Sequence, residues 1–259
     1  MSPRRRLLVI AVLALAVGLL VTVVVRLVHG GTPEGAPDQA RPGPVLLVPG
    51  YGGNPAALSR LADRLRAAGR TATVVIPPGD GTGDLRAQAD NLDRAVRRAL
   101  RDGASSVDIV GYSAGGVVAR LWLDRHDGAS AARRIVTLGS PLHGARIAAA
   151  GSAVAPDACP PACQQLAPGS DLLAGLHRGP LPPVPWLSVW TENDETVQPP
   201  DSARLDGAVN VPIQSVCPDA RIAHGQLPTD PLVMALVLRA LGSAPLAVPS
   251  DCAALRAAA

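Results

Sequence analysis

Residues 107–123 read VDIVGYSAGGVVARLWL. The run opens with a segment typical of a buried strand, Val107–Val110, and continues as an apolar helix, Ala114–Arg125. Between them lies the pattern Gly-x-Ser-x-Gly, centred on Ser113. Such a tight turn strains the backbone of the serine, and its glycines remove side chains that would clash. The stretch predicts that Ser113 projects above a sheet at a helix N-terminus, where it can act as a nucleophile. A structural serine in an ordinary turn is the alternative.

Strand-like and helix-like segments alternate on both sides of this stretch. Further strands are predicted at 45–48, 71–76, 134–138, 186–190 and 209–216, and further helices at 55–68, 84–101 and 232–241. Residues 140–183, rich in Pro and Gly, are predicted to be irregular. The alternation predicts an α/β protein with a mostly parallel sheet of about six strands and helices on both faces. In such sheets the functional site lies at the carboxyl ends of the strands.

The segment VLLVPGYGG, residues 45–53, is a second strand that runs into a glycine-rich turn. Small residues there allow backbone N–H groups to point into a site, as an oxyanion hole requires. We expect the two donors to be the N–H of Ala114, directly after the nucleophile, and the N–H of Tyr51. An ordinary turn that needs glycine only for its dihedral angles is the alternative.

A serine hydroxyl needs a base, and five histidines compete for this role. His224 follows the last predicted strand, which fits the chain order nucleophile, acid, histidine. His143, just after the strand at 134–138, is the second candidate. The other three lie in the predicted linker, at the end of the helix after Ser113 and in the irregular stretch: His29, His126 and His177.

Acidic residues follow the predicted strand at 186–190. A carboxylate at that position can hold the imidazole of the base in the tautomer that catalysis needs. Asp194 is the first candidate, and Glu192 and Glu195 are its rivals.

Four segments resemble the bacterial class 2 lipases, a triacylglycerol lipase and esterase family of the α/β-hydrolase superfamily: residues 48–53, 107–123, 134–145 and 206–225. The resemblance extends from Pro44 to Leu238. It implies the α/β-hydrolase fold, a lipid or small ester as substrate, and Asp194 and His224 as partners of Ser113.

The chain departs from the pattern of these lipases in two places. Pro49 stands where the family usually has the histidine of a His-Gly-x-Gly-Gly turn, which weakens the assignment of Tyr51. The segment 142–183 is longer than a minimal member needs, and we interpret it as a small lid or insertion.

The N-terminus has Arg4-Arg5-Arg6 before an uncharged apolar run of 19 residues, Leu7–Val25. A membrane-spanning helix needs roughly 20 residues, whereas the core of a signal peptide usually has about 7–15. We therefore expect residues 1–28 to be an uncleaved transmembrane signal anchor, with the body outside the cytoplasm. A signal peptide cut near residue 30 is the alternative. Residues 29–43 indicate a flexible linker to a catalytic domain at 44–259.

Four cysteines are typical of an oxidising compartment. Three connectivities are possible. We favour Cys159–Cys163, which closes a tight loop, and Cys217–Cys252, which ties the C-terminal tail to the body. A metal site at Cys159 and Cys163 is weakly supported, because no second ligand pair lies nearby in the sequence.

The charge balance excludes several classes of protein. All 24 basic residues are arginines, so the chain has neither a Schiff-base lysine nor a phosphate-loop lysine. Four of them lie in residues 1–28, so the rest of the chain has 20 arginines against 21 acidic residues. This body lacks the basic excess that binding to nucleic acid requires. No metal or cofactor is implied, and we expect a monomer.

These patterns predict an extracytoplasmic, membrane-tethered serine hydrolase that cleaves carboxylic esters through an acyl-enzyme. A cell-envelope acyltransferase could use the same triad and pass the acyl group to an alcohol other than water. A non-catalytic binding domain could keep the fold without the activity. The sequence alone leaves both alternatives open.

Overall fold

The computed structural model describes Arg5 and residues 35–258. Apart from Arg5, the predicted anchor at 1–28 and residues 29–34 of the predicted linker lie outside the described residues. None of the helices in the described part of the chain has the length and apolar character needed to cross a membrane. The described residues from Ala36 onward form one compact unit, so residues 36–43 of the predicted linker belong to the same unit as the body.

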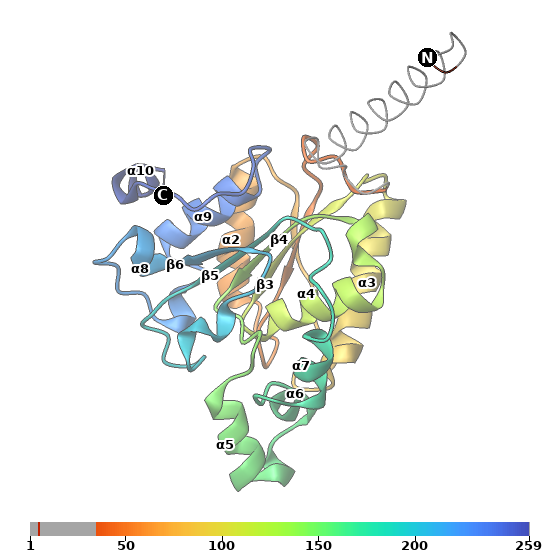
Figure 1. The fold of residues 1–259 in the computed structure, drawn as a ribbon, viewed down its shortest axis with the longest axis vertical. Coiled ribbons are helices and arrows are strands. Elements are labelled where there is room, and N and C mark those ends of the chain that lie inside the picture. The colour runs from red at the N-terminus through yellow and green to blue at the C-terminus, as the bar shows by residue number, and fades with distance from the viewer. Residues whose placement is uncertain (1–4, 6–34, 259) are drawn as a thin grey trace. The chain divides into compact units, whose positions relative to one another are not determined.

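A six-stranded sheet forms the centre of this unit (Figure 1). Every neighbouring pair of strands is parallel, which confirms the predicted sheet. The strand order is β2-β1-β3-β4-β5-β6. The strands are β1 (Val45–Val48), β2 (Ala72–Val74), β3 (Val107–Tyr112), β4 (Ala132–Leu138), β5 (Trp186–Trp190) and β6 (Val209–Pro212).

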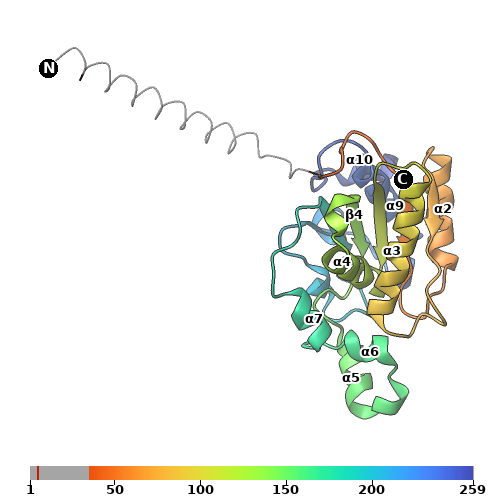
Figure 2. The same ribbon diagram turned by 90° about the vertical axis from the view of Figure 1, so that its right-hand side faces the viewer.

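Helices cover both faces of the sheet (Figures 1 and 2). Side chains alternate along each strand, so Leu46 and Val48 join one apolar cluster while Val45 and Leu47 join the other. The first cluster is packed under α3 (Leu85–Arg101) and α4 (Ala114–Arg125). The second is packed under α2 (Ala56–Ala67) and α9 (Pro231–Ala240). Burial of both faces explains why β1 reads as a continuous apolar run.

The stretch 140–183, predicted to be irregular, contains three helices: α5 (Arg146–Val154), α6 (Pro161–Gln165) and α7 (Asp171–Leu176). In both ribbon views α5 and α6 lie side by side and project from the body (Figures 1 and 2). The prediction was wrong here because these helices are short and have little apolar periodicity of their own, and α5 and α7 each contain a glycine, Gly151 and Gly175.

A second difference concerns the predicted strand at 209–216. The strand β6 ends at Pro212, which has no N–H to continue the ladder, and Ile213–Val216 form the short helix α8. The chain also ends in a helix that was not predicted, α10 (Cys252–Ala257).

The structure contains both favoured disulfides. Cys159–Cys163 links the segment before α6 to α6 itself, and its Cα atoms are 5.4 Å apart. Cys217–Cys252 joins the end of α8 to the start of α10 across 35 residues. The second bond therefore ties the C-terminal tail to the body, as the sequence predicts.

Candidate active site

Ser113 lies in the turn between β3 and α4, with φ 52° and ψ −125°. A positive φ is strained for a residue with a side chain, so the surrounding structure must impose it. Two neighbouring glycines explain how the turn closes. A Cβ on Gly115 would lie 2.2 Å from the carbonyl oxygen of Val48, and one on Gly111 would lie 2.6 Å from the Cα of Gly116. Only glycine allows backbone segments to approach this closely.

The structure brings Ser113, His224 and Asp194 together. His224 Nε2 is 3.0 Å from Ser113 Oγ, and its Nδ1 is 2.7 Å from Asp194 Oδ2. The other carboxylate oxygen of Asp194 accepts hydrogen bonds from the backbone N–H groups of Thr196 and Val197, at 2.9 and 2.6 Å. Asp194 is 1% exposed and His224 is 6% exposed. This arrangement fixes the imidazole with one nitrogen free to accept the serine proton.

The rival carboxylates make different contacts. Glu195 accepts a hydrogen bond from the backbone N–H of His224 at 3.0 Å rather than from its ring. Glu192 is exposed, and its backbone N–H donates to Gln214 Oε1 at 2.9 Å. Neither carboxylate therefore occupies the position that Asp194 has against the imidazole.

The rival histidines lie elsewhere. His143 stacks on His177 with ring centroids 4.4 Å apart, and its Nδ1 is 3.1 Å from the carbonyl oxygen of Ser202. His126 Nε2 is 2.8 Å from a carboxylate oxygen of Asp90. His29 lies outside the described residues.

The proposed oxyanion donors belong to two segments beside Ser113. Ala114 is the first residue of α4, and the first backbone N–H groups of a helix have no partner within it. The turn that contains Tyr51 also passes close to the serine, because a Cβ on Gly50 would lie 3.0 Å from Ser113 Cβ. The Tyr51 side chain is 46% exposed and points out of the core. The use of the Tyr51 N–H as a donor stays a prediction.

Two residues around His224 had no role in the sequence analysis. The hydroxyl of Tyr112 donates to the carbonyl oxygen of His224 at 3.3 Å, and the two rings lie 5.2 Å apart. Burial, and then the charges of Asp194 and Glu195, raise the pKa of Tyr112 to about 12. Gly139 lines the other side, where a Cβ would lie 3.1 Å from His224 Nδ1. Tyr112 occupies a variable position of the Gly-x-Ser-x-Gly pattern, so the motif gave no signal for it.

No group of three or more His, Cys, Asp or Glu side chains that could hold a metal ion occurs in the part of the chain that the structure describes. The arrangement at Ser113 can support nucleophilic catalysis, with a histidine as the base and a carboxylate that orients it.

Comparison with known proteins supports the fold. A family model described as PGAP1-like alpha/beta domain matches residues 80–155, which cover α3 to α5. A sequence search among curated proteins finds no match. The bacterial class 2 lipase family, which the motifs resemble, stays a prediction.

Solved structures with similar architecture include two lipases and a deformylase. Aspergillus fumigatus lipase B has a TM-score of 0.67 and 21% identity over 78% of this chain, which spans 53% of that protein. Mature Bacillus licheniformis lipase BlEst2 has a TM-score of 0.65 and 19% identity over 82% of this chain and 96% of its own. The Pseudomonas putida S16 deformylase Nfo has a TM-score of 0.52 and 18% identity over 78% of this chain and 93% of its own. Together with the six-stranded parallel sheet, these likenesses show that the chain has the α/β-hydrolase fold.

Proposed function

We propose that this chain is a serine hydrolase that cleaves carboxylic esters, with Ser113, His224 and Asp194 as its catalytic triad. The observation that carries the proposal is the hydrogen-bonded series from Ser113 Oγ through the imidazole of His224 to Asp194, in a strained turn at the carboxyl end of β3. A structural serine has no need of a positive φ or of a buried imidazole that is itself held by a carboxylate.

The mechanism follows from these positions. Ser113 Oγ attacks the ester carbonyl carbon while His224 Nε2 takes the hydroxyl proton, and Asp194 stabilises the resulting imidazolium. The N–H groups of Ala114 and Tyr51 bind the oxyanion of the tetrahedral intermediate. The intermediate collapses, and His224 returns the proton to the departing alcohol. The same imidazole then takes a proton from a water molecule as the water oxygen attacks the acyl carbon. The bond from that carbon to Ser113 Oγ breaks, His224 gives the proton to Ser113 Oγ, and the carboxylic acid leaves.

We propose a lipid ester as the substrate. The motifs resemble bacterial class 2 lipases, and two structures of similar fold are lipases. The projecting helix α5 also exposes Ile147 by 65% and Val154 by 85%, which suits contact with an apolar substrate. In this proposal the segment 142–183 acts as a small lid beside the site.

We further propose that the domain works outside the cytoplasm, tethered by residues 1–28. Two disulfides support an oxidising compartment, because cytosolic proteins rarely keep such bonds. The basic start and the apolar run at 7–25 support the anchor.

Hydrolysis of p-nitrophenyl esters from acetate to palmitate tests the function. The full chain, purified in the oxidised state, should release p-nitrophenol, and preference for long chains would identify a lipase. Ser113→Ala should lose a factor of about 10⁴ or more in kcat. Equal hydrolysis by the variant would overturn the assignment of the nucleophile.

A further inference from the structure

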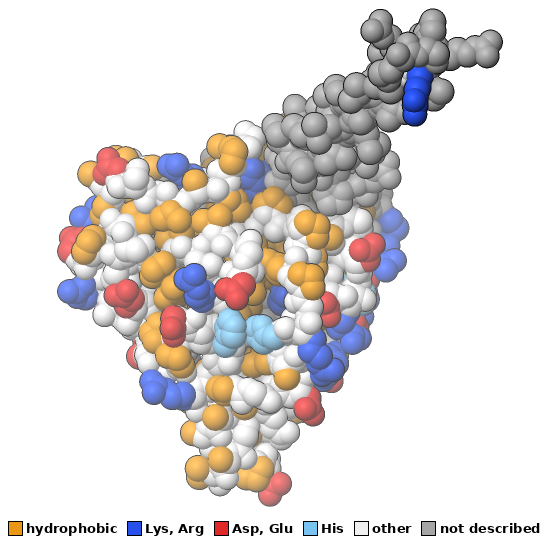
Figure 3. Space-filling view, in the orientation of Figure 1, with side chains coloured by type: hydrophobic (Ala, Val, Ile, Leu, Met, Phe, Trp, Pro, Cys, Tyr) orange, Lys and Arg blue, Asp and Glu red, His pale blue; other side chains and the backbone are white. Residues whose placement is uncertain are grey.

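A cavity of about 440 Å³ has a lining that includes none of the three residues of the proposed triad. It lies among α4, the end of α7, the loop 179–184 and residues 205–207. The connection from β5 to β6 contains only one short 3₁₀ helix, η3 (Pro200–Ala203), so no long helix from this connection fills the space. Figure 3 looks onto one face of the molecule where histidine side chains lie together beside acidic and basic ones.

The cavity is lined in part by a buried guanidinium with unused hydrogen-bonding capacity. Arg120 is 4% exposed, and its Nη2 donates to the carbonyl oxygen of Leu176 at 3.1 Å. Its Nη1 has no hydrogen-bond partner, and the carboxylate of Asp124 stays 3.8 Å away. Burial lowers the pKa of Arg120, yet a guanidinium remains charged at neutral pH. A buried, incompletely paired cation favours an anionic ligand.

Two stacked imidazoles add to this preference. Their ring planes are 13° apart. His177 Nε2 is 3.0 Å from the carbonyl oxygen of Leu142, and His143 Nδ1 contacts that of Ser202. Because a carbonyl oxygen only accepts, these nitrogens carry the protons, and the second nitrogen of each ring becomes a donor only on protonation. Burial, followed by the nearby His143 and Arg120, lowers the pKa of His177, so an anion is needed to favour its protonated form.

The same geometry argues against a shared metal ion. A metal lies in the plane of an imidazole that binds it, and two nearly parallel rings with centroids 4.4 Å apart have no common in-plane position. The remaining walls are largely apolar, because they consist of Leu176, Pro180, Leu181, Pro182, Pro183, Val184 and Leu205. Asp206 is the one carboxylate in the lining, and its charge opposes a dianion more strongly than a monoanion.

We propose that this cavity binds a small organic monocarboxylate. The carboxylate lies at Arg120 and the two histidines, and the apolar body of the ligand packs against the loop 179–184. The site is separate from Ser113, and the proposal does not rest on ester hydrolysis.

Isothermal titration of the full chain with hexanoate tests the proposal, with acetate and inorganic phosphate at equal ionic strength as comparisons. Hexanoate should bind at least 10-fold more tightly than either, because neither acetate nor phosphate has an apolar body of this size and because phosphate is largely a dianion at pH 8. Affinity should rise as the pH falls from 8 to 6, since protonation of His177 adds a donor beside Arg120 and offsets Asp206. Tighter binding of phosphate than of hexanoate would overturn the ligand class.

Variants locate the site. Arg120→Met should weaken hexanoate binding at least 10-fold, whereas Arg125→Met, an exposed position on the same helix, should leave it unchanged. His177→Gln should remove most of the pH dependence and serves as the test if Arg120→Met does not fold. Hexanoate binding should also survive labelling of Ser113 with a fluorophosphonate. Binding that neither variant weakens, or that labelling abolishes, would overturn the proposal.

Discussion

Both ends of the His224 backbone are held by side chains from its neighbours in the site. The carboxylate of Glu195 accepts the hydrogen bond of its N–H, and the hydroxyl of Tyr112 donates to its carbonyl oxygen. These residues are directly next to Asp194 and Ser113 in the chain. The two segments that contain the proposed acid and the proposed nucleophile therefore also hold the loop that contains the proposed base.

Removal of the Glu195 carboxylate should loosen this loop. We expect Glu195→Ala to lower kcat/KM for ester hydrolysis about 10-fold, because one hydrogen bond to a charged group contributes about 1.5 kcal/mol. Glu195→Gln keeps an acceptor and should recover most of the rate. Glu192→Ala, at an exposed position in the same loop, is the control. Equal rates in Glu195→Ala and Glu192→Ala would contradict the positioning role.

Tyr112 should make stability depend on pH at alkaline values. The pKa of Tyr112 is about 12 in the folded state, whereas the pKa of its phenol in the unfolded chain is about 10. Above pH 10 the folded state therefore holds more protons, so stability falls as the pH rises toward 12. Tyr112→Phe lacks this contribution. Urea unfolding of both proteins between pH 8.5 and 11 checks this, and a stability difference that stays constant with pH would contradict it.

At the scale of elements, the turn from β3 to α4 depends on Gly115. A Cβ there would collide with backbone atoms of β1 and the following Pro49, which cannot move without disturbing the sheet. We expect Gly115→Ala to lower the free energy of unfolding by about 3 kcal/mol or more. Gly175→Ala in α7 is the matched control, because its Cβ meets nothing within 4 Å. Urea unfolding should show little loss, or a small gain, for the control. A similar effect of both substitutions would contradict this account.

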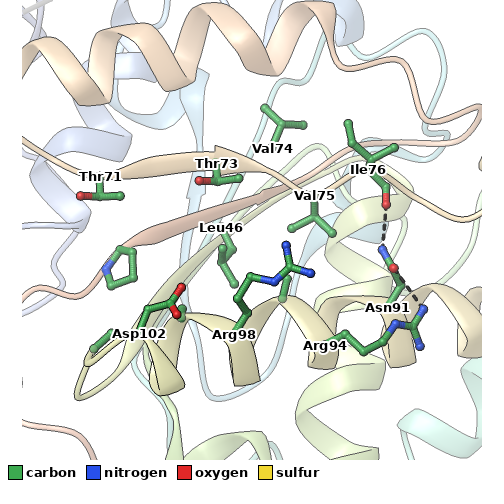
Figure 4. A pocket seen from close by; sticks show the side chains of 14 residues that line it. Leu46, Thr71, Thr73, Val74, Val75, Ile76, Asn91, Arg94, Arg98 and Asp102 are labelled. Carbon is green, nitrogen blue, oxygen red and sulfur yellow. Dashed lines mark hydrogen bonds between the residues drawn. The ribbon is translucent and has the colours of Figure 1, made fainter.

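The edge strand β2 is protected from pairing with other chains. Arg66 donates to the carbonyl oxygen of Ala72, and Asn91 donates to that of Ile76 at 2.8 Å. Figure 4 shows the Asn91 contact at one end of a groove of about 600 Å³, and Arg98 extending from α3 toward the strand side between Leu46 and Val75. Charged and amide side chains that occupy the outer carbonyls are a common means of preventing edge-to-edge association.

Most of the sheet could be predicted from the sequence because its central strands β1, β3, β4 and β5 are buried on both faces and contain short apolar runs. The helix α4 was predicted with its observed bounds, since a strong motif and a long apolar stretch coincide. The helices α5, α6 and α7 were missed because tertiary contacts and one disulfide, rather than local periodicity, determine them. Ser113, Asp194 and His224 could be proposed from motif and chain order. The contact of Tyr112 with His224 could not, because it joins two residues that are 112 positions apart and no motif marks Tyr112.

At the scale of the whole molecule, a buried ion cluster joins three parts of the chain. Asp108 on β3 is fully buried, and its carboxylate oxygens accept from Arg133 Nε and Nη2 at 2.9 and 2.6 Å and from Arg70 at 2.5 Å. Arg133 also donates to the carbonyl oxygens of Leu241, after α9, and of Gln39 in the predicted linker. This cluster connects the amino ends of the strands to the C-terminus of α9, where cations are favoured.

Breaking the cluster should destabilise the domain. Arg133→Met leaves a buried carboxylate with one partner fewer, and we expect a loss of about 3–5 kcal/mol in the free energy of unfolding. Arg101→Met, at an exposed position, should change it by less than about 0.5 kcal/mol. Guanidinium chloride unfolding monitored by tryptophan fluorescence measures both. A small effect of Arg133→Met would show that solvent or a rearranged partner replaces the arginine.

The central claim is that Ser113 is an activated nucleophile. The most direct measurement is labelling of the oxidised full chain with a fluorophosphonate, followed by mass spectrometry of its peptides. We predict one label per chain on Ser113, no label in Ser113→Ala, and labelling of His224→Ala slowed by at least 100-fold. A chain that stays unlabelled, or that is labelled on another serine, would contradict the account.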